Sequence, residues 1–341
     1  MKILVTGSDG YIGSVLAPLL IERGHDVAGV DAGYYRAAWL YPGPERIPAT
    51  LRRDIRDLEP ADFAGFDAVV HMAELSNDPL GQLAPDITYS INHKGSLHIA
   101  ELAKAAGVSR FVYTSSCSVY GIATDDDVDE ESPTNPQTAY ATCKTFVERD
   151  VLAMASDDFS PTFLRNATVY GASPRMRFDL VLNNLAGLAR TTGLVAMTSD
   201  GTPWRPLVHV LDVCKAIAVS LEADRNVVHN EVFNVGDTAQ NYRIREIAET
   251  IGSVFSDCEV TFGPPSGDTR SYRVSFAKIH KSLPDFSCEW DAERGARQLF
   301  DLFERIGLTA DDFDHRSYTR LKQLDHLLTT NQLDDTFRWR S

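Results

Sequence analysis

The chain has 341 residues, of which 43% are hydrophobic and 24% are charged, an ordinary composition for a folded globular protein. Its formal net charge of -15 argues against binding to nucleic acid or to an anionic membrane, although a few local arginines could still bind a small anion. No apolar run is long enough to span a bilayer, and the five scattered cysteines form no CxxC pair or Cys/His cluster that would predict a metal site. The N-terminus leads straight into a strand-like run without a signal-peptide cleavage pattern, so we expect a cytoplasmic protein.

The first thirty residues read as strand, glycine turn, helix and strand. Residues 2–6 and 26–30 are short apolar runs, and residues 14–24 have a helical pattern. Three glycines spaced three apart permit a tight turn, close approach of the backbone to a pyrophosphate and close packing of helix on strand. An acid at the end of the second strand can accept hydrogen bonds from an adenosine ribose, and its charge favours NAD, although Arg36 nearby leaves NADP open. The residues that this pattern assigns to the dinucleotide are Gly7, Gly10, Tyr11, Ile12, Gly13 and Asp31.

Strand-like and helical segments continue to alternate along the first half of the chain. Strands are predicted at residues 67–73 and 110–115, with a helix near 89–107 between them. The alternation predicts an α/β fold with a doubly wound parallel sheet, whose ligands bind at the carboxyl ends of the strands. Asp54 and Ile55 follow a short polar run and could contact the adenine, while a solvated loop is an equal alternative for Asp54.

Tyr140 and Lys144 stand four residues apart in a segment that reads as a helix. At this spacing the two side chains lie one turn apart on the same helix face. A cation near a phenol favours the phenolate, so the pKa of Tyr140 should fall from its reference value of about 10. Tyr140 would then be a usable general base near neutral pH. The spacing occurs by chance in many helices, so its meaning depends on the rest of the chain.

Four motifs together resemble the extended short-chain dehydrogenase/reductase family, and within it the nucleotide-sugar epimerases and dehydratases (UDP-glucose 4-epimerase-like). The motifs are the glycine triplet, His71-Met72-Ala73, Ser115-Ser116-Cys117-Ser118-Val119-Tyr120-Gly121 and Tyr140-x-x-x-Lys144. The resemblance covers nearly the whole chain. It implies a Rossmann domain that binds NAD, a smaller α/β lobe that binds a nucleotide-diphosphate sugar, and a homodimer formed through the helix near 89–107 and the helix that carries Tyr140.

The resemblance also implies boundaries and roles. The NAD-binding domain would comprise residues 1–168 and about 203–235, and the substrate lobe about 169–202 and 236–341. Tyr140 would take a proton from a substrate hydroxyl, Ser116 would orient the same oxygen, and Lys144 would hold the nicotinamide ribose. Tyr140 and Lys144 are also assigned to the cofactor site, as are Ala73 and Asn92, the latter supporting the active site from its helix.

Departures from the family pattern bear on the expected reaction. Family dehydratases usually carry an acid pair directly after the catalytic hydroxyl, where this chain has Cys117 and Ser118. Family C3/C5 epimerases place a cysteine two residues before the tyrosine of the Val-Tyr segment, where this chain has Ser118. A 4-epimerase needs no additional acid or base, so 4-epimerisation is the expected reaction. Glu74 stands where the family often has alanine; it could be an extra base, which would revive dehydration or C3/C5 epimerisation, or it could bind a sugar hydroxyl.

The second half of the chain carries the expected substrate contacts. The resemblance assigns Asn184, Arg205 and Arg270 to the nucleotide sugar, with Arg270 preferred over Arg273. A loop rich in proline and arginine leads into a helix start and suits a diphosphate, and Arg175 in that loop could contact it or face solvent. The predicted substrate residues are Glu74, Ser76, Ser116, Cys117, Ser118, Thr168, Arg175, Asn184, Arg205 and Arg270.

Two alternatives to 4-epimerisation remain at this point. One is a reductase of 4-keto sugars on the same scaffold. The other is a non-catalytic NAD(P)-sensing protein, although such proteins typically lack the Tyr/Lys pair that this chain keeps. Two structural expectations complete the prediction: Asp212 should be the N-cap of a helix at residues 213–221, and the segment from about residue 311 should be helical and pack against the substrate lobe.

Overall fold

A parallel sheet of seven strands forms the centre of the molecule, in the order β10-β6-β5-β4-β1-β2-β3. The computed structural model describes residues 1–37, 39–76, 84–122, 127–265 and 270–340. The strands are β1 (Lys2–Thr6), β2 (Asp26–Asp31), β3 (Ala49–Arg52), β4 (Ala68–His71), β5 (Arg110–Ser116), β6 (Ser160–Asn166) and β10 (Glu231–Val235). The strand order reverses direction at β1, as in a doubly wound fold, and the predicted Rossmann-type α/β architecture is confirmed.

Helices cover both faces of this sheet because its strands are apolar on both sides. In β1, Ile3 and Val5 belong to one hydrophobic core and Leu4 to the other, since successive side chains point to opposite faces. The first core includes helices α1 (Gly13–Glu22) and α7 (Val210–Glu222); the second includes α4 (Ser96–Ala105) and α5 (Ala139–Leu152). A short helix, α3 (Pro85–Thr88), and a π-helical stretch, Tyr89–Gly95, lead into α4. Two short helices lie near the sheet edge, α8 (Arg225–Val228) and α10 (Ala277–Ser282).

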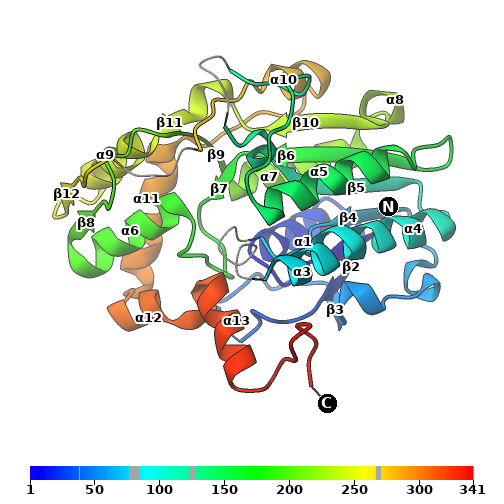
Figure 1. Ribbon diagram of the computed structural model, residues 1–341, viewed down its shortest axis with the longest axis horizontal. Coiled ribbons are helices and arrows are strands. Elements are labelled where there is room, and N and C mark those ends of the chain that lie inside the picture. Colours follow the sequence, from blue (N-terminus) through cyan, green and yellow to red (C-terminus); the bar gives the residue numbers. More distant parts are fainter. Residues whose placement is uncertain (38, 77–83, 123–126, 266–269, 341) are drawn as a thin grey trace.

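A smaller lobe continues the first of these cores (Figure 1). It holds a three-stranded sheet of β7 (Thr168–Tyr170), β9 (Trp204–His209) and β11 (Asn241–Arg243), and a two-stranded sheet of β8 (Leu194–Ala196) and β12 (Glu259–Thr261). Its helices are α6 (Val181–Thr192), α9 (Ile244–Val254), α11 (Ala292–Ile306) and α12 (Ala310–Asp314). The predicted domain boundaries stay a prediction. Within the described ranges, no helix is both long and apolar enough to cross a membrane.

The C-terminal segment returns to the Rossmann domain, and the prediction for it is only half correct. Phe313 of α12 packs on Phe178 near α6, with ring centroids 4.8 Å apart, as expected of a segment on the substrate lobe. The next helix, α13 (Arg320–Thr329), instead places Leu324 and Leu327 in the core that also holds the α4 and α5 side chains. Apolar residues alone do not reveal which of two neighbouring cores they will join, and for α13 the predicted choice of the substrate lobe is therefore wrong.

Asp212 lies in the first turn of α7 and is not its N-cap. That position is taken by His209, whose Nδ1 accepts a hydrogen bond from the Leu211 backbone N–H at 3.2 Å. The Asp212 carboxyl is 2% exposed and accepts the backbone N–H groups of Glu289 and Trp290. Burial raises the pKa of Asp212 to about 6. Asp212 therefore connects α7 to the segment before α11.

Replacing Asp212 by asparagine should flatten the pH dependence of stability between about pH 4 and pH 6. The pKa of the Asp212 carboxyl is higher in the folded than in the unfolded chain, so its protonation stabilises the folded state. This stabilisation is complete below the unfolded pKa and is lost as pH rises to about 6. In the wild type the free energy of unfolding should fall by up to about 3 kcal/mol over this range. The asparagine variant should not show this fall, because its amide does not titrate. Urea unfolding of both proteins from pH 4 to pH 7 measures this difference. Parallel stability curves would contradict the assignment.

Candidate active site

A cavity of about 410 Å³ lies at the carboxyl ends of the central strands. This is the edge at which ligands of doubly wound sheets bind. Side chains from four regions line it: the glycine turn, the ends of β2, β4 and β5, the start of α5, and the smaller lobe. The predicted site residues among them are Gly7, Gly10, Tyr11, Ile12, Gly13, Asp31, Asp54, Ile55, Ala73, Glu74, Ser76, Ser116, Ser118, Tyr140, Lys144, Thr168, Arg205 and Arg270.

The glycine turn has the backbone shape that a phosphate-binding turn requires. Gly7 has a φ of +76°, in the left-handed region that favours glycine. A Cβ added to Gly13 would lie 2.2 Å from the Gly7 carbonyl oxygen, so a larger residue cannot fit there without moving the turn. Helix α1 begins at Gly13 with its N-terminus at the cavity wall, so its dipole favours negative charge there.

Asp31 ends β2 and faces the same cavity. Its Oδ1 accepts the Gly33 backbone N–H at 2.7 Å, and its Oδ2 accepts the Asp9 backbone N–H at 3.1 Å. Burial raises the pKa of Asp31. The two backbone contacts fix the carboxyl group where the fold pattern expects a ribose, because they hold it between the glycine turn and the loop after β2.

The three predicted catalytic residues line the cavity together. The Thr138 side chain caps α5 by accepting the Ala141 backbone N–H at 3.1 Å, and this cap starts the helix directly before Tyr140. Lys144 lies one turn further on, with its Nζ 5.4 Å from the centroid of the Tyr140 ring. Ser116 ends β5, and its Oγ accepts the Ser118 backbone N–H at 3.1 Å. The end of β5 and the start of α5 thus contribute to the wall of the same cavity.

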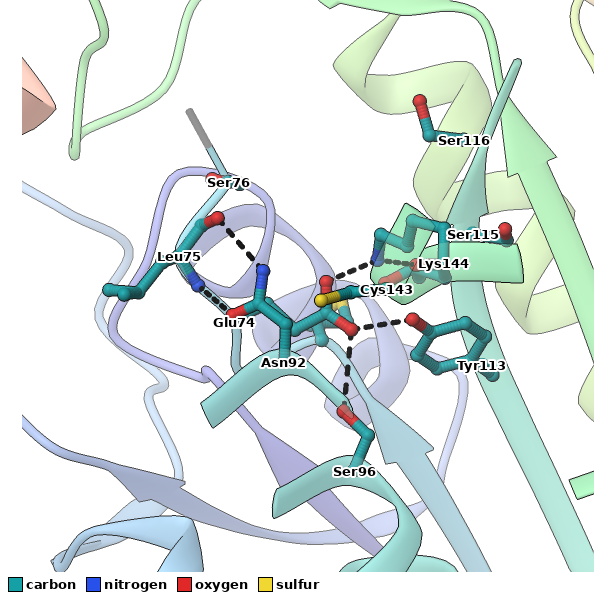
Figure 2. Close-up of polar contacts among 12 residues, drawn as sticks. Glu74, Leu75, Ser76, Asn92, Ser96, Tyr113, Ser115, Ser116, Cys143 and Lys144 are labelled. Atoms are coloured by element: carbon teal, nitrogen blue, oxygen red, sulfur yellow. Dashed lines mark hydrogen bonds and ion pairs between the residues drawn. The ribbon is translucent and has the colours of Figure 1, made fainter. Parts of the chain in front are cut away.

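Glu74 is the counter-ion of Lys144 (Figure 2). Its Oε2 lies 2.6 Å from Lys144 Nζ, with 1% and 5% of the two side chains exposed, and Lys144 also donates to the Thr114 carbonyl oxygen at 2.5 Å. The other carboxylate oxygen, Oε1, accepts hydrogen bonds from the Tyr113 hydroxyl at 2.5 Å and the Ser96 hydroxyl at 3.3 Å. Burial alone would lower the pKa of Lys144, but Glu74 and Tyr140 outweigh it and raise that pKa. Lys144 is therefore a charged group whose charge is balanced within the protein.

Comparison with known proteins identifies the family to which this chain belongs. The model of the NAD dependent epimerase/dehydratase family matches residues 3–236. The chain belongs to this NAD-dependent enzyme family. It is 30% identical over 267 residues to the UDP-glucose 4-epimerase of Corynebacterium glutamicum, covering 73% of this chain and 79% of the relative.

Two solved structures extend the comparison. One is the protein MoeE5 in complex with UDP-glucuronic acid and NAD, with a TM-score of 0.78 and 27% identity over 89% of this chain and 99% of that one. The other is an NAD-dependent NDP-hexosamine 5,6-dehydratase involved in tunicamycin biosynthesis, with a TM-score of 0.79 and 25% identity over 89% and 98% of the two chains. This epimerase/dehydratase chain therefore has both reaction types among its relatives.

Two buried polar atoms at the cavity have the hydrogen-bonding capacity that a bound cofactor or substrate would use. Ser118 Oγ and Asn166 Oδ1 are buried without a hydrogen-bond partner among the described residues, and both residues line the cavity. Such atoms are costly unless a ligand or water satisfies them. Asn166 was missed as a site residue, although the rule that ligands bind at strand ends applies to it as the last residue of β6. The glycine turn and Asp31 complete a wall that fits NAD.

Asn92 supports the site without lining the cavity. Its Oδ1 accepts the Leu75 backbone N–H at 2.8 Å, and its Nδ2 donates to the Leu75 carbonyl oxygen at 3.1 Å (Figure 2). It is fully buried and fixes the turn that carries Glu74 and Ser76. Because both polar atoms of its side chain bond the Leu75 backbone, Asn92 is placed to support the site rather than to contact the cofactor, and its assignment to the cofactor site stays a prediction.

Three further predicted substrate residues do not line the cavity. The Cys117 thiol turns into the core and donates to the Arg165 carbonyl oxygen at 3.2 Å. Arg175 pairs with Asp9, and Asn184 Nδ2 donates to the Phe178 carbonyl oxygen at 2.8 Å. Each side chain is engaged by a neighbour that the linear sequence does not reveal, and the cavity gives these three substrate assignments no support.

The arginines that do line the cavity are Arg177, Arg205, Arg270 and Arg320. Arg205 Nη1 donates to the Arg270 carbonyl oxygen at 2.5 Å, and this contact joins the two predicted phosphate ligands. Arg273 instead pairs with Asp127 at 3.0 Å, which agrees with the choice of Arg270 over Arg273. Arg177, two residues after Arg175, faces the cavity. Arg320 was missed because nothing in the sequence links the C-terminal helix to the site.

Proposed function

We propose that the protein is an NAD-dependent nucleotide-sugar 4-epimerase. The match to the epimerase/dehydratase family and the 30% identity to a UDP-glucose 4-epimerase support this reaction. The cavity supplies the groups that it needs, namely a phenol, a hydroxyl and a paired lysine at one end and the glycine turn with Asp31 at the other. We propose the cavity-lining residues named above as the NAD and substrate contacts.

The reaction then assigns one task to each catalytic side chain. NAD, when bound, would supply the reversible hydride acceptor that oxidation at C4 of the sugar and its reversal require. Tyr140 takes the proton of the C4 hydroxyl and later gives it back. Ser116 hydrogen-bonds the same oxygen and orients it. Lys144 binds the nicotinamide ribose and stabilises the Tyr140 phenolate with its charge.

The observation that carries this proposal is the engagement of Glu74. Both of its carboxylate oxygens are held, by Lys144 and by Tyr113, so it is poorly suited to remove a proton from a sugar carbon. Cys117, at the position of one family dehydratase acid, turns its thiol away from the cavity. In the described part of the cavity wall the other carboxyl groups are Asp31 and Asp54, which we propose for the adenosine end. Simple 4-epimerisation needs none of these groups as an additional base.

Dehydration is the second candidate, and it rests on two specific observations. One is the structural likeness to an NDP-hexosamine 5,6-dehydratase, with a TM-score of 0.79. Glu74 also lines the cavity despite its contacts. A dehydratase that used Glu74 as a base would have to break its ion pair with Lys144 during turnover.

A panel of UDP-, dTDP- and GDP-linked sugars tests the reaction. We expect one of them to be converted into its C4 epimer without added cofactor being consumed, as followed by proton NMR of the sugar ring. A product that has lost water would overturn 4-epimerisation in favour of dehydration. Net oxidation of added NADH would identify a reductase of keto sugars instead.

The substrate and the assembly complete the proposal. We propose that Arg205 and Arg270 bind the diphosphate of the nucleotide sugar and that Thr168 contacts the substrate, because all three line the cavity on the side of the smaller lobe. A homodimer through α4 and α5 follows from the resemblance to relatives. Light scattering at micromolar concentration tests it, and a monomeric mass would contradict it.

A further inference from the structure

Helix α13 lies at one end of the cavity, where its residue Arg320 is part of the cavity wall. This helix and the residues after it lie outside residues 3–236, which the family model matches. The loop after β2 holds them in place. Gln323 Nε2 donates to the Tyr34 carbonyl oxygen at 3.0 Å, and Trp339 Nε1 donates to the Ala32 carbonyl oxygen at 2.6 Å. The Tyr34 hydroxyl donates to the Phe337 carbonyl oxygen at 2.5 Å. The C-terminal segment, red in Figure 1, is thus fixed beside the strand that ends in Asp31.

Arg320, the first residue of α13, brings a buried cation into this end of the cavity. It is 5% exposed, and its guanidinium carbon lies 3.8 Å from the centroid of the Tyr35 ring. In the described part of the chain, the guanidinium makes no hydrogen bond and no ion pair. Burial, together with the nearby charge of Arg177, lowers the pKa of Arg320 from its usual 12.5 to about 10. A buried guanidinium with five donors and no acceptor is unusual, because such groups are normally paired.

Among the described residues no carboxylate forms an ion pair with the Arg320 guanidinium, although Asp179 Oδ2 accepts the Arg320 backbone N–H at 3.4 Å and the charges of Asp179 and Asp31 partly offset the effect of burial on the Arg320 pKa. Arg177 already pairs with Asp179 at 2.9 Å and donates to Ser76 Oγ at 3.1 Å. The Asp31 carboxylate is held by two backbone N–H groups. The N-terminus of α1 lines the same cavity and adds its own preference for negative charge. The glycine turn, Arg177 and Arg320 all line this cavity and are the groups that a bound diphosphate would contact.

We propose that Arg320 binds the diphosphate of the NAD cofactor and that the C-terminal helix thereby closes the cofactor site. The inference rests on the NAD site proposed above. A guanidinium matches phosphate oxygens in geometry and charge, and it gives the buried Arg320 the acceptors that it lacks. Since α13 is tied to the loop after β2, the cofactor would have to displace this contact in order to leave. Retention of this kind suits an enzyme that returns its cofactor to the starting state in every turnover.

Binding of ADP-ribose and of adenosine to the full chain tests the role of Arg320 without relying on activity. Titration calorimetry on protein freed of bound nucleotide should show that Arg320→Gln weakens ADP-ribose binding by about 10- to 100-fold, the usual range for a charged hydrogen-bonded contact. Adenosine, which has no phosphate, should lose less than about 3-fold. Arg320→Lys should fall between the wild type and Arg320→Gln, because it keeps the charge and loses the forked geometry. Lys322→Gln is the matched control, since that side chain on the same helix is 54% exposed.

Two results would overturn the inference. One is unchanged ADP-ribose affinity in Arg320→Gln. The other is an equal loss for adenosine and ADP-ribose, which would mean that the substitution only loosens α13. Titration with NADP as a third ligand identifies the phosphate that is contacted: if Arg320 instead served a 2′-phosphate, the substitution would weaken NADP binding and spare NAD. Because the readout is binding, a chain that retains this behaviour yet shows no 4-epimerisation would refute the proposed reaction and leave the role of Arg320 intact.

Discussion

Replacing Tyr140 by phenylalanine should lower kcat by about 100- to 10,000-fold, the range expected when a general acid–base group is lost. The substitution removes one oxygen atom and keeps the ring, so the 5.4 Å packing distance to Lys144 and the fold should persist. Affinity for NAD should therefore change little. Rapid mixing that follows the absorbance of reduced cofactor would place the loss in the step that removes hydrogen from the sugar.

Tyr89→Phe is the matched control for this experiment. Tyr89 is half-buried near Phe146 of α5 and does not line the cavity, so its hydroxyl can be removed without touching the site. We expect its kcat to stay within about 2-fold of the wild type, since surface substitutions have small effects. A Tyr140→Phe variant as active as Tyr89→Phe would show that another group moves the proton.

Replacing Glu74 by glutamine should have the largest effect on stability of any change at the site. The amide keeps the shape of the side chain and removes the charge that balances Lys144, and both side chains are almost completely buried. Breaking a buried ion pair by neutralising one partner costs about 3–5 kcal/mol of unfolding free energy. Denaturant unfolding of the cofactor-free protein at pH 7 measures this loss.

The double variant Glu74→Gln/Lys144→Met separates stability from catalysis. With both charges gone, no uncompensated charge is left in the core, so stability should return to near the wild-type value. Activity should not return, because Lys144 has been lost. If the double variant were as unstable as Glu74→Gln alone, the ion pair would not be the cause of the loss.

The same substitution of Glu74 should shift the pH–rate profile. Glu74 helps to raise the pKa of Lys144 against the effect of burial, so its removal lets that pKa fall. Lys144 must stay protonated to stabilise the Tyr140 phenolate, and the alkaline limb of the profile should therefore move to lower pH in Glu74→Gln. An unchanged alkaline limb would contradict a role for Glu74 as the lysine's counter-ion.

Local sequence patterns were sufficient to predict the parts of the site that lie close together in the chain. The glycine turn, Asp31 and the Tyr140/Lys144 pair each depend on one strand end or one helix turn, and all of them line the cavity. Ser116, the last residue of β5, was assigned through the family resemblance and lines the same cavity. These residues come together because parallel strands bring their carboxyl ends to one edge.

The failures involve contacts between segments far apart in the sequence. Glu74 could be predicted as unusual, but its pairing with Lys144 joins positions 70 residues apart. Asn92 was assigned to the cofactor because its use of both amide atoms on the Leu75 backbone cannot be read from spacing. Arg320 enters the cavity only because α13 docks on the loop after β2.

The fate of the hydrogen atoms on the sugar ring tests the central claim most directly. The enzyme is incubated in D₂O with the nucleotide sugar that it accepts, once unlabelled and once with deuterium at C4, and the products are examined by NMR and mass spectrometry. In 4-epimerisation the C4 hydrogen travels as a hydride and does not exchange, while a hydrogen removed from carbon by a base exchanges with solvent. We predict a C4 epimer that gains no carbon-bound deuterium from D₂O and keeps the label at C4. Deuterium at C3 or C5, or a product lighter by one water, would contradict the account.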